Sequence, residues 1–512
     1  MNSETAFGWR ELELGKSAGL DFLGLESPIE KILDAETSGI TNATERARYF
    51  SIMPWYYWKY TTLTGEGSSR DQRRFIVGFE MLLAYANIAW VEQTGIASRG
   101  IIRRDFCEKM WKKGGGNLPL RGDAVGDTPS PIDAAFYGPS LRRLGLLGRF
   151  GELHTCRVAG HAIALELEKT LGHLPTLPKL IESDVVDRAT IHQLAPLLAL
   201  SKTQTRENQL LRDLLFSDGD FAMDELPPRV TSFLLMLRLA ASTEKSFRDR
   251  DIEVALALGN DLSGVTLTVE LPLQQTHSHW RILALLKFLR HASEMAFAAL
   301  HAFVRTTPHA YPTAESAAVS LINSTCQLCR SSHGVPTAAF RAIVDAYRSE
   351  NSVPEWNPPG NDPEEMLLHA CRLAAWCQSI LSRDHGAELL LDDMSKVGQG
   401  ADADLSGYVV QMQGLLDRPL EASLRWLLVE RGVARHFQVA ARKLVQHDTF
   451  RLIEDEGGVA ATQSCTVAGV AIRIGAMLSL MADVQLLESG DEGYRRSTET
   501  DLWYRQQVLR LA

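Results

Sequence analysis

Cysteines and histidines in the second half of the chain have part of the spacing that a zinc site requires. Cys326 and Cys329 form a C-x2-C pair, which is one half of a common zinc site. Because these residues fall in stretches with the apolar spacing of helices, free core thiols explain the pattern better than a metal. We predict no metal here. The thiols and imidazoles that follow do not form a matching second pair; they are His333, His369, Cys371 and Cys377.

A second group of titratable residues lies around one predicted helix. His291 and Glu294 are three residues apart, and Glu294 and His301 are about two turns apart, so each pair shares a helix face. A metal site or an acid–base pair could use such residues. No H-E-x-x-H motif or pair of carboxylates completes the group, and we favour structural histidines. Its members are His277, His279, His291, Glu294, His301 and His309.

Two motifs of nucleotide binding are absent from the sequence: the chain has no G-x-x-x-x-G-K-[ST] loop and no dinucleotide fingerprint. The letters G-x-S-x-G occur once, as G-K-S-A-G at 15–19, and we expect no nucleophile elbow there. The glycine-rich segment 145–151 follows no predicted strand, and we discount it as a phosphate loop. We therefore expect no cofactor and favour a protein without catalytic activity. Nuclease carboxylates can be dispersed along a chain, so a metal-dependent nuclease stays open as an alternative.

Basic residues are concentrated near the N-terminus of an acidic protein. The formal net charge is −10, yet residues 45–160 contain 17 Lys and Arg against 11 Asp and Glu. Arginine suits phosphate contacts, so this excess predicts a DNA-binding face, although a solvated helical surface explains it about as easily. The predicted contacts are Arg46, Arg48, Arg73, Arg74, Arg103, Arg104, Arg142 and Arg143, with Arg495 and Arg496 as a second site.

The segment 39–60 combines two arginines with many large aromatic side chains. A helix beginning near Glu45 would carry Arg46 and Arg48 about 200° apart, so we expect one to face inward and one outward. Pro54 should end or kink this helix. A core helix with arginines paired to carboxylates is the alternative to a ligand site. Aromatic residues are also enriched at protein interfaces. The candidate partner-binding residues are Tyr49, Trp55 and Trp58.

Composition and length place the chain among globular proteins. Its 512 residues are 45% hydrophobic and 23% charged, which predicts about two to four domains with a large core. The odd number of cysteines, seven, indicates free thiols in a reducing compartment. The N-terminus lacks the apolar run of a signal peptide. The chain also lacks an uncharged run of about 20 apolar residues, which a membrane span would need. We expect a cytoplasmic protein with no membrane contact.

The apolar spacing predicts a mainly α, multi-domain protein with few short strands. The clearest long helix is 278–304, another is 363–382, and 265–271 alternates as a strand would. Residues 490–498 (G-D-E-G-Y-R-R-S-T) resemble the hairpin that follows the second helix of a winged-helix domain, so we expect a C-terminal winged-helix-like module. No internal repeat is evident. The predicted domains are an N-terminal helical domain with a basic face (1–155), a central helical domain (156–350), a linker and helix (351–404) and the winged-helix-like domain (405–512).

Three passages carry a resemblance to other proteins. They are T-N-x-T-x-R-A-R-Y-F…P-W-x-x-W at 41–58, G-I-I-R-R…F-Y-G-P-S-L-R-R-L-G-L-L at 100–147, and W-R…H-A-S-E-x-A-F-x-A-L at 280–300. The chain resembles a group of bacterial proteins of unknown function that are typically encoded in mobile or defence-type gene clusters. The group has no established catalytic residue to carry over. The resemblance implies a cytoplasmic partner of other proteins in an antiviral defence complex that acts on foreign DNA.

These observations together favour a non-catalytic subunit of such a system that binds double-stranded DNA or a DNA-handling protein. A metal-dependent nuclease effector is the alternative from the enzyme class. A third alternative is an assembly scaffold, in which the aromatic segment is a protein interface.

Overall fold

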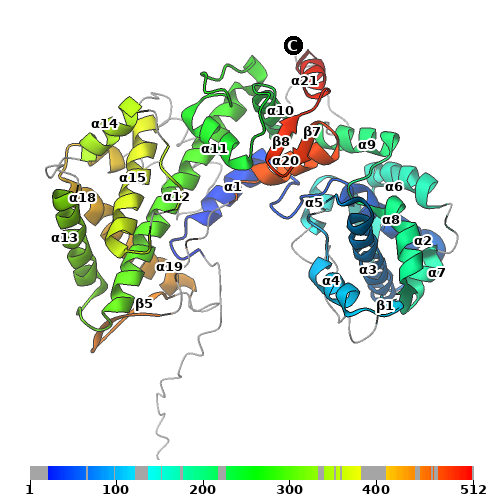
Figure 1. Ribbon diagram of the computed structural model, residues 1–512, viewed down its shortest axis with the longest axis horizontal. Helices are drawn as coiled ribbons and strands as arrows, with labels where there is room; N and C mark the ends of the chain where they lie inside the picture. Colours follow the sequence, from blue (N-terminus) through cyan, green and yellow to red (C-terminus); the bar gives the residue numbers. More distant parts are fainter. Residues whose placement is uncertain are drawn as a thin grey trace, which may run out of the picture. The chain divides into compact units, whose positions relative to one another are not determined.

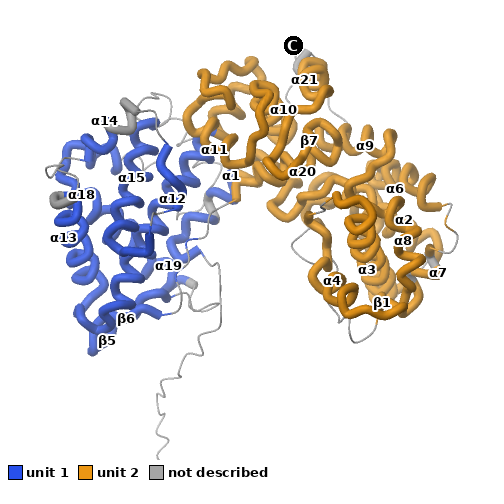
Figure 2. Tube along the Cα trace, in the orientation of Figure 1, with its two compact units in different colours: residues 1–32, 281–470 blue, residues 33–280, 471–512 orange. Residues whose placement is uncertain are grey.

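The structure is a computed structural model of the 512-residue chain (Figure 1). Its contacts divide the chain into two compact units, each discontinuous in sequence: unit 1 comprises 1–32 and 281–470, and unit 2 comprises 33–280 and 471–512 (Figure 2). The four consecutive domains stay a prediction. The described residues are 21–64, 67–96, 99–121, 137–150, 153–172, 174, 177–216, 227–332, 340–350, 353–357, 360–381, 411–443, 450–462, 465, 467 and 471–509.

Helices α2 (Tyr49–Thr64) and α3 (Ser69–Thr94) lie in unit 2. Ser68 caps α3 by accepting a hydrogen bond from the Asp71 amide at 3.1 Å, and Gly95 ends it in the left-handed conformation. Among the described residues, α3 is the one helix long and apolar enough to cross a membrane. Because 72% of that apolar window is buried inside the protein, its apolar character matches that of a core helix.

Helix α2 begins later and continues further than the sequence predicts. It starts at Tyr49 rather than near Glu45, and it passes Pro54 to end at Thr64. Ten of its 16 residues are buried, and it packs against α3 and against α6 (Val158–Leu171). This burial offsets the hydrogen bond that a proline cannot donate.

The predicted strand 265–271 is a loop in the structure. The Asp261 carboxylate accepts a hydrogen bond from the Val265 amide at 3.1 Å. The start of the segment is therefore bonded to a residue four positions earlier in the chain and not to a strand of a sheet. The other elements of unit 2 are α4 (Arg104–Lys113), β1 (Asn117–Pro119), α5 (Gly138–Arg143), α7 (Leu177–Glu182), β4 (Val185–Asp187), α8 (Arg188–Leu198), α9 (Thr205–Phe216), α10 (Pro228–Ala240), α11 (Asp249–Leu258), η1 (Leu271–Leu273), α20 (Ile474–Asp483) and α21 (Thr500–Leu509). Strand β1 pairs antiparallel with β4.

Unit 1 is a helical unit around α12 (Gln274–Thr306), which contains the predicted helix 278–304. Helix α15 (Pro363–Leu381) likewise confirms the predicted helix 363–382 to within one residue. Helix α12, like α1 (Glu26–Glu36), contributes residues to both units. The other helices of unit 1 are α13 (Ala314–Ser332), α14 (Phe340–Glu350), α18 (Leu420–Arg425), the π-helical η2 (Trp426–Ala434) and α19 (Arg435–Lys443).

Three β-hairpins in the described residues have the same pairing register, although the sequence shows no repeat. Each begins with a buried leucine, and two residues join its strands. Most other equivalent side chains differ, so the likeness lies in the backbone. The hairpins are β2 (Leu147–Phe150) with β3 (Leu153–Cys156) and β7 (Leu487–Gly490) with β8 (Gly493–Arg496) in unit 2, and β5 (Leu452–Asp455) with β6 (Gly458–Ala461) in unit 1.

Two of these hairpins receive backbone hydrogen bonds from a third segment at the same position of their second strand. In β8, Tyr494 exchanges two backbone hydrogen bonds with Phe247, at 2.7 and 2.8 Å. In β6, Val459 bonds the backbone of His309 at 3.0 Å and that of Tyr311 at 2.9 Å. Each hairpin is therefore extended on one edge by a short stretch of chain, which removes unpaired backbone groups from that edge.

The β2–β3 hairpin achieves the same pairing with a side chain. The equivalent residue of β3 is His154, and its partner is Gln72 near the start of α3. The Gln72 amide donates to the His154 carbonyl and accepts from the His154 amide, both at 3.0 Å. A glutamine side chain thus replaces a backbone strand, and it joins the first turns of α3 to the hairpin.

Candidate nucleic-acid interface

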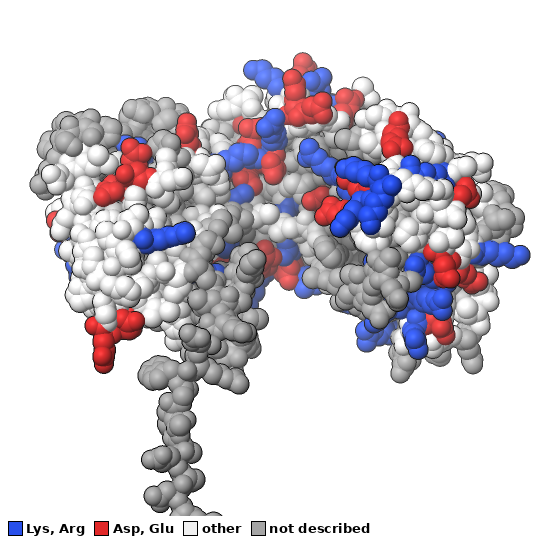
Figure 3. All heavy atoms as spheres, turned by 60° about the horizontal axis from the view of Figure 1, so that its bottom comes forward, with Lys and Arg blue, Asp and Glu red and all other residues white. Residues whose placement is uncertain are grey.

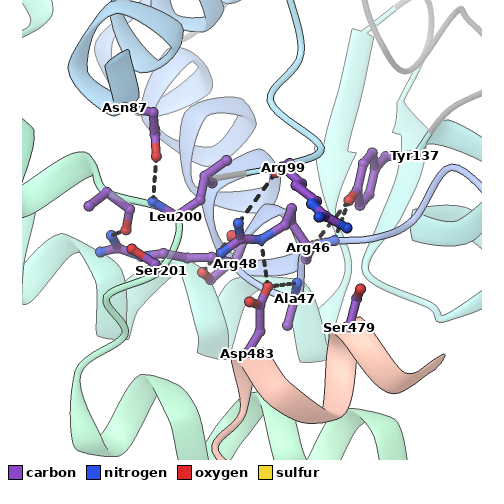
Figure 4. Close-up of polar contacts among 12 residues, drawn as sticks. Arg46, Ala47, Arg48, Asn87, Arg99, Tyr137, Leu200, Ser201, Ser479 and Asp483 are labelled. Atoms are coloured by element: carbon purple, nitrogen blue, oxygen red, sulfur yellow. Dashed lines mark hydrogen bonds and ion pairs between the residues drawn. The ribbon is translucent and has the colours of Figure 1, made fainter. Parts of the chain in front are cut away.

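Arg46 and Arg48, the first two predicted DNA contacts, are buried in ion pairs of unit 2. Arg46 Nε lies 2.9 Å from Asp483 of α20, and the same carboxylate oxygen accepts a hydrogen bond from the Ala47 amide at 2.8 Å (Figure 4). Arg48 Nε lies 3.2 Å from Glu207 of α9. Both side chains face inward, which corrects the expectation that one faces solvent. They precede α2, so helical spacing does not separate them.

Arg103 is a third predicted contact that the structure places inside unit 2. It precedes α4 in the left-handed conformation (φ 63°), and its Nε lies 2.8 Å from the buried carboxylate of Glu80 in α3. Burial raises the pKa of Glu80 to about 8, while the guanidinium acts in the opposite direction. Arg103 therefore joins α3 to α4, and we assign it a positioning role rather than a DNA contact.

Two of the three aromatic residues predicted to bind a partner lie in the core. Tyr49 and Trp55 are 1% and 0% exposed, and the Trp55 indole donates to Glu168 at 2.8 Å. A ring buried to this extent has no surface to offer a second protein. Trp58 is half-buried, and its ring centroid lies 6.2 Å from that of His161 on α6. Of the three, Trp58 alone remains a candidate for contact.

Arg495 and Arg496 lie on β8 among carboxylates. Arg496 pairs with Glu244 at 2.5 Å and with Asp501 at 3.3 Å, and Arg495 lies 3.9 Å from Glu492. The β7–β8 hairpin carries three acidic residues against these two arginines. Its surface is therefore not positive, which weakens the prediction of a second DNA site there.

Exposed arginines gather around the β2–β3 hairpin. Arg149 is exposed on β2, and exposed Arg157 lies over the same strand, because a Cβ on Gly148 would come within 3.1 Å of its Nε. Arg73 and Arg74 follow Gln72 on α3 and are exposed, but helical spacing turns them about 100° and 200° away from the side of α3 that bonds β3. Exposed Arg142 is the last residue but one of α5, shortly before the hairpin. We call the exposed arginines on or just before the hairpin the hairpin rim; its members are Arg142, Arg149 and Arg157.

Two members of the hairpin rim, Arg149 and Arg157, were not predicted from the sequence. The glycine-rich segment 145–151, which contains Arg149, carries the signal: it does not fit a phosphate loop, and its residues 147–150 form the first strand of the hairpin. Figure 3 shows Lys and Arg gathered on unit 2, interspersed with acidic residues, whereas the face of unit 1 in this view is mostly uncharged.

Carboxylates compensate some of the exposed arginines of this region. Arg74 lies 4.0 Å from Asp184, and both side chains are more than half exposed. The predicted contact Arg143 pairs with Asp34 at 2.9 Å, and a second predicted contact, Arg104, pairs with Glu108 on α4. Exposed pairs of this kind contribute at most about 1 kcal/mol, so a phosphate can displace them.

The thiols and histidines do not form a metal centre in the described part of the chain. No group of three or more His, Cys, Asp or Glu side chains that could hold a metal ion occurs among the described residues, and His333 lies outside them. Cys326, Cys329 and Cys371 are free cysteines. Burial raises the pKa of the Cys371 thiol to about 12, which leaves it protonated and unreactive at neutral pH.

The histidines and glutamate of α12 make separate structural contacts. His291 Nε2 donates to the Trp356 carbonyl at 2.9 Å, with the two rings stacked at 3.6 Å between centroids. His301 Nε2 donates to another backbone carbonyl at 2.7 Å. Glu294 pairs with Arg290 at 2.7 Å, and burial raises the pKa of Glu294 to about 7. These three α12 residues fix the core of unit 1.

A groove of about 360 Å³ lies between α3 and α4. Arg104 and Lys112 on its edge both lie within 4.0 Å of Glu108, so its charges are balanced and favour neither an anion nor a cation. The lining residues are Ile88, Val91, Glu92, Ile101, Arg104, Glu108, Trp111 and Lys112.

Comparison of the chain with protein-family models, with curated proteins and with solved structures finds no match. The function is accordingly inferred from the residues of the chain itself.

Proposed function

We propose that this protein is a non-catalytic subunit that binds double-stranded DNA through the hairpin rim of unit 2. The observation that supports this most is the grouping of three exposed arginines on α5 and on the β2–β3 hairpin that follows it. Arginine side chains bind phosphates through charge-assisted hydrogen bonds, and such contacts position a protein on a duplex. The resemblance to proteins of defence-type gene clusters points in the same direction.

We also propose that the hairpins belong to modules of the winged-helix type. In unit 2, α10, the extended Phe247, α11, α20 and the β7–β8 hairpin follow one another in the order of such a domain, with unit 1 inserted between α11 and α20. Helix α20 would then be the recognition helix, yet none of its residues is exposed and none is basic. The DNA contact is therefore assigned to the β2–β3 hairpin, and the module that contains α20 is given a structural role.

The proposal is tested by measuring DNA affinity as a function of salt. A labelled duplex is titrated with the purified chain at several NaCl concentrations, and the anisotropy of the label is recorded. We expect affinity to fall steeply with salt, with a slope of about −0.9 per phosphate contact. The double variant Arg149→Glu, Arg157→Glu should bind weakly to every sequence and show a slope about two units shallower.

The matched control is Arg495→Glu on β8, which removes an exposed arginine from the hairpin with the same register. It should leave affinity and slope unchanged, because that hairpin already carries an excess of carboxylates. Equal losses in the rim and control variants would sink the assignment to the hairpin rim. If the unaltered protein shows no salt-sensitive DNA binding, the scaffold function gains instead.

The nuclease alternative is separated from binding by one further assay. Supercoiled plasmid is incubated with the purified chain and Mg²⁺ or Mn²⁺. A non-catalytic subunit leaves the plasmid intact, and nicking or linearisation that EDTA abolishes would establish a metal-dependent nuclease.

A further inference from the structure

Residues 353–357 lie between α14 and α15, where the sequence predicts a linker, yet two histidines fix them to unit 1. His291 Nε2 of α12 donates a hydrogen bond to the Trp356 carbonyl at 2.9 Å. His369 Nε2 of α15 donates to the carbonyl of the preceding residue, Glu355, also at 2.9 Å. Two helices thus hold two consecutive carbonyls of one irregular segment. We call residues 353–357 the strap.

The Trp356 ring is a further anchor of the strap. It stacks on the His291 ring, with 3.6 Å between centroids and 13° between the ring planes. The Phe288 ring meets it edge-on at 5.4 Å, and the Lys287 ammonium lies 5.4 Å from its centroid. Phe288 packs in turn against Trp376 of α15, with 4.7 Å between centroids. The strap therefore covers an aromatic contact between α12 and α15.

The surroundings of His369 favour its neutral form while the strap is docked. The residue is 5% exposed, and this burial lowers the pKa of His369 below its ordinary value. The Glu355 carbonyl acts in the opposite direction by accepting the hydrogen bond, and the Arg372 guanidinium lowers the pKa further. Lys287 of α12 adds a positive charge beside the strap, and Cys329 of α13 faces Arg372 as a neutral thiol, because burial raises its pKa.

Detachment of the strap would remove the residue that covers Nε2 of His369, so the imidazole would titrate in water at its ordinary pKa of about 6.5. Just below that pH, the detached form therefore binds one proton more than the docked form. Since the pKa of His369 is lowered in the docked form, docking is favoured above the ordinary pKa and loses this advantage as the pH falls.

We propose that the strap is a pH-sensitive device, which detaches from α12 and α15 below about pH 6.5 and uncovers Phe288. Phe288 is 0% exposed while Trp356 lies against it, so detachment presents an apolar surface that is hidden at neutral pH. The proposal is independent of DNA binding, because the strap belongs to unit 1 and the hairpin rim to unit 2.

Fluorine NMR of the full chain labelled with fluorotryptophan tests the device. Trp356→Phe identifies the Trp356 resonance by its loss. Between about pH 7.5 and about pH 5, this resonance should change from the shift of a stacked ring to that of a free ring. The ratio of detached to docked strap should rise by about tenfold per pH unit at most, which is the limit for one proton. The resonances of buried Trp55 and Trp280 should stay unchanged.

His369→Gln is the matched variant, because a glutamine amide can donate to the Glu355 carbonyl but cannot gain a proton. Its strap should stay docked at about pH 5. Arg372→Gln removes the like charge near His369, so less of its strap should detach at that pH than in the unaltered protein.

Three outcomes would overturn the proposal. The first is a Trp356 resonance that does not respond to pH, and the second is an unchanged pH response in His369→Gln. The third is a shift of the Trp55 and Trp280 resonances together with that of Trp356, because it would report unfolding of the whole protein rather than detachment of the strap. The salt-dependent DNA titration is read separately, so a failure of one proposal is distinguishable from a failure of the other.

Discussion

In unit 2 the β2–β3 hairpin follows α5, and the β7–β8 hairpin follows α20. Both hairpins pair their strands in the same register, and both receive two hydrogen bonds at the equivalent residue of the second strand, His154 or Tyr494. Their surfaces differ, since one is bordered by exposed arginines and the other carries more carboxylates than arginines. The backbone hydrogen bonds therefore define the hairpin, and the side chains around it define what it can bind.

The residues at the ends of the two preceding helices show the same contrast. Helix α5 ends with Arg143, which is exposed and paired with Asp34. Helix α20 ends with Asp483 at the equivalent position, which holds Arg46 and the Ala47 amide. The last residue of the helix therefore lies on the surface in α5 and forms an interior ion pair of unit 2 in α20.

The largest difference between the two regions is expected for truncation of these terminal residues. Asp483→Ala removes the carboxylate of a buried ion pair and should lower the free energy of unfolding by about 3–5 kcal/mol. Arg143→Ala removes one partner of an exposed pair and should cost at most about 1 kcal/mol. Urea unfolding followed by circular dichroism measures both. Similar losses in the two variants would show that the helix ends are equivalent in energy as well as in position.

An effect of similar size is expected where the third segment approaches β8. Gly493 has φ +122°, and a Cβ there would lie 2.3 Å from the Phe247 carbonyl oxygen. Gly493→Ala should cost about 1–3 kcal/mol in backbone strain. It should cost about 1 kcal/mol more for each of the two hydrogen bonds that Phe247 loses. The equivalent residue of β3 is Leu153, and in that hairpin the Gln72 side chain takes the place of the backbone segment.

The control for Gly493→Ala is Gly490→Ala in the same hairpin. No atom lies within 4 Å of a Cβ at Gly490, so this change should stay within about 0.5 kcal/mol. Thermal unfolding of the two variants, measured side by side, separates the close approach of Phe247 from a general effect of alanine in the hairpin. If Gly490→Ala is as destabilising as Gly493→Ala, the close approach is not the cause.

The smallest effect is expected for the side chain that replaces a strand. Gln72→Ala removes both hydrogen bonds to His154 and should cost about 0.5–1.5 kcal/mol for each bond. Hydrogen exchange at the His154 amide should accelerate, while exchange at the Tyr494 amide should not change, because its partner is backbone. Arg73→Ala, at the exposed neighbouring position, should alter neither amide. If hydrogen exchange at the His154 amide is unchanged in Gln72→Ala, Gln72 is not the hydrogen-bond partner of the β2–β3 hairpin.

The helices could be predicted from the sequence because helical packing leaves a local period of apolar residues. The pattern located α12 and α15 closely, and it located the β7–β8 hairpin through the turn residues at 490–498. The pattern for 265–271 predicted a strand, but a strand also needs a neighbour to accept its hydrogen bonds, and alternation alone does not supply one. The excess of basic residues in 45–160 was likewise visible without a structure.

Which arginines are available to a ligand was decided by tertiary structure alone. Arg46 is 437 residues from Asp483, and no local pattern reports a partner at that separation. Burial in such pairs turned Arg46, Arg48 and Arg103 into structural residues, while the unpredicted Arg149 became part of the exposed rim. Residue type and spacing therefore determined the helices and the overall charge. The energy of burying a charge, which depends on residues distant in the chain, determined which charges face solvent.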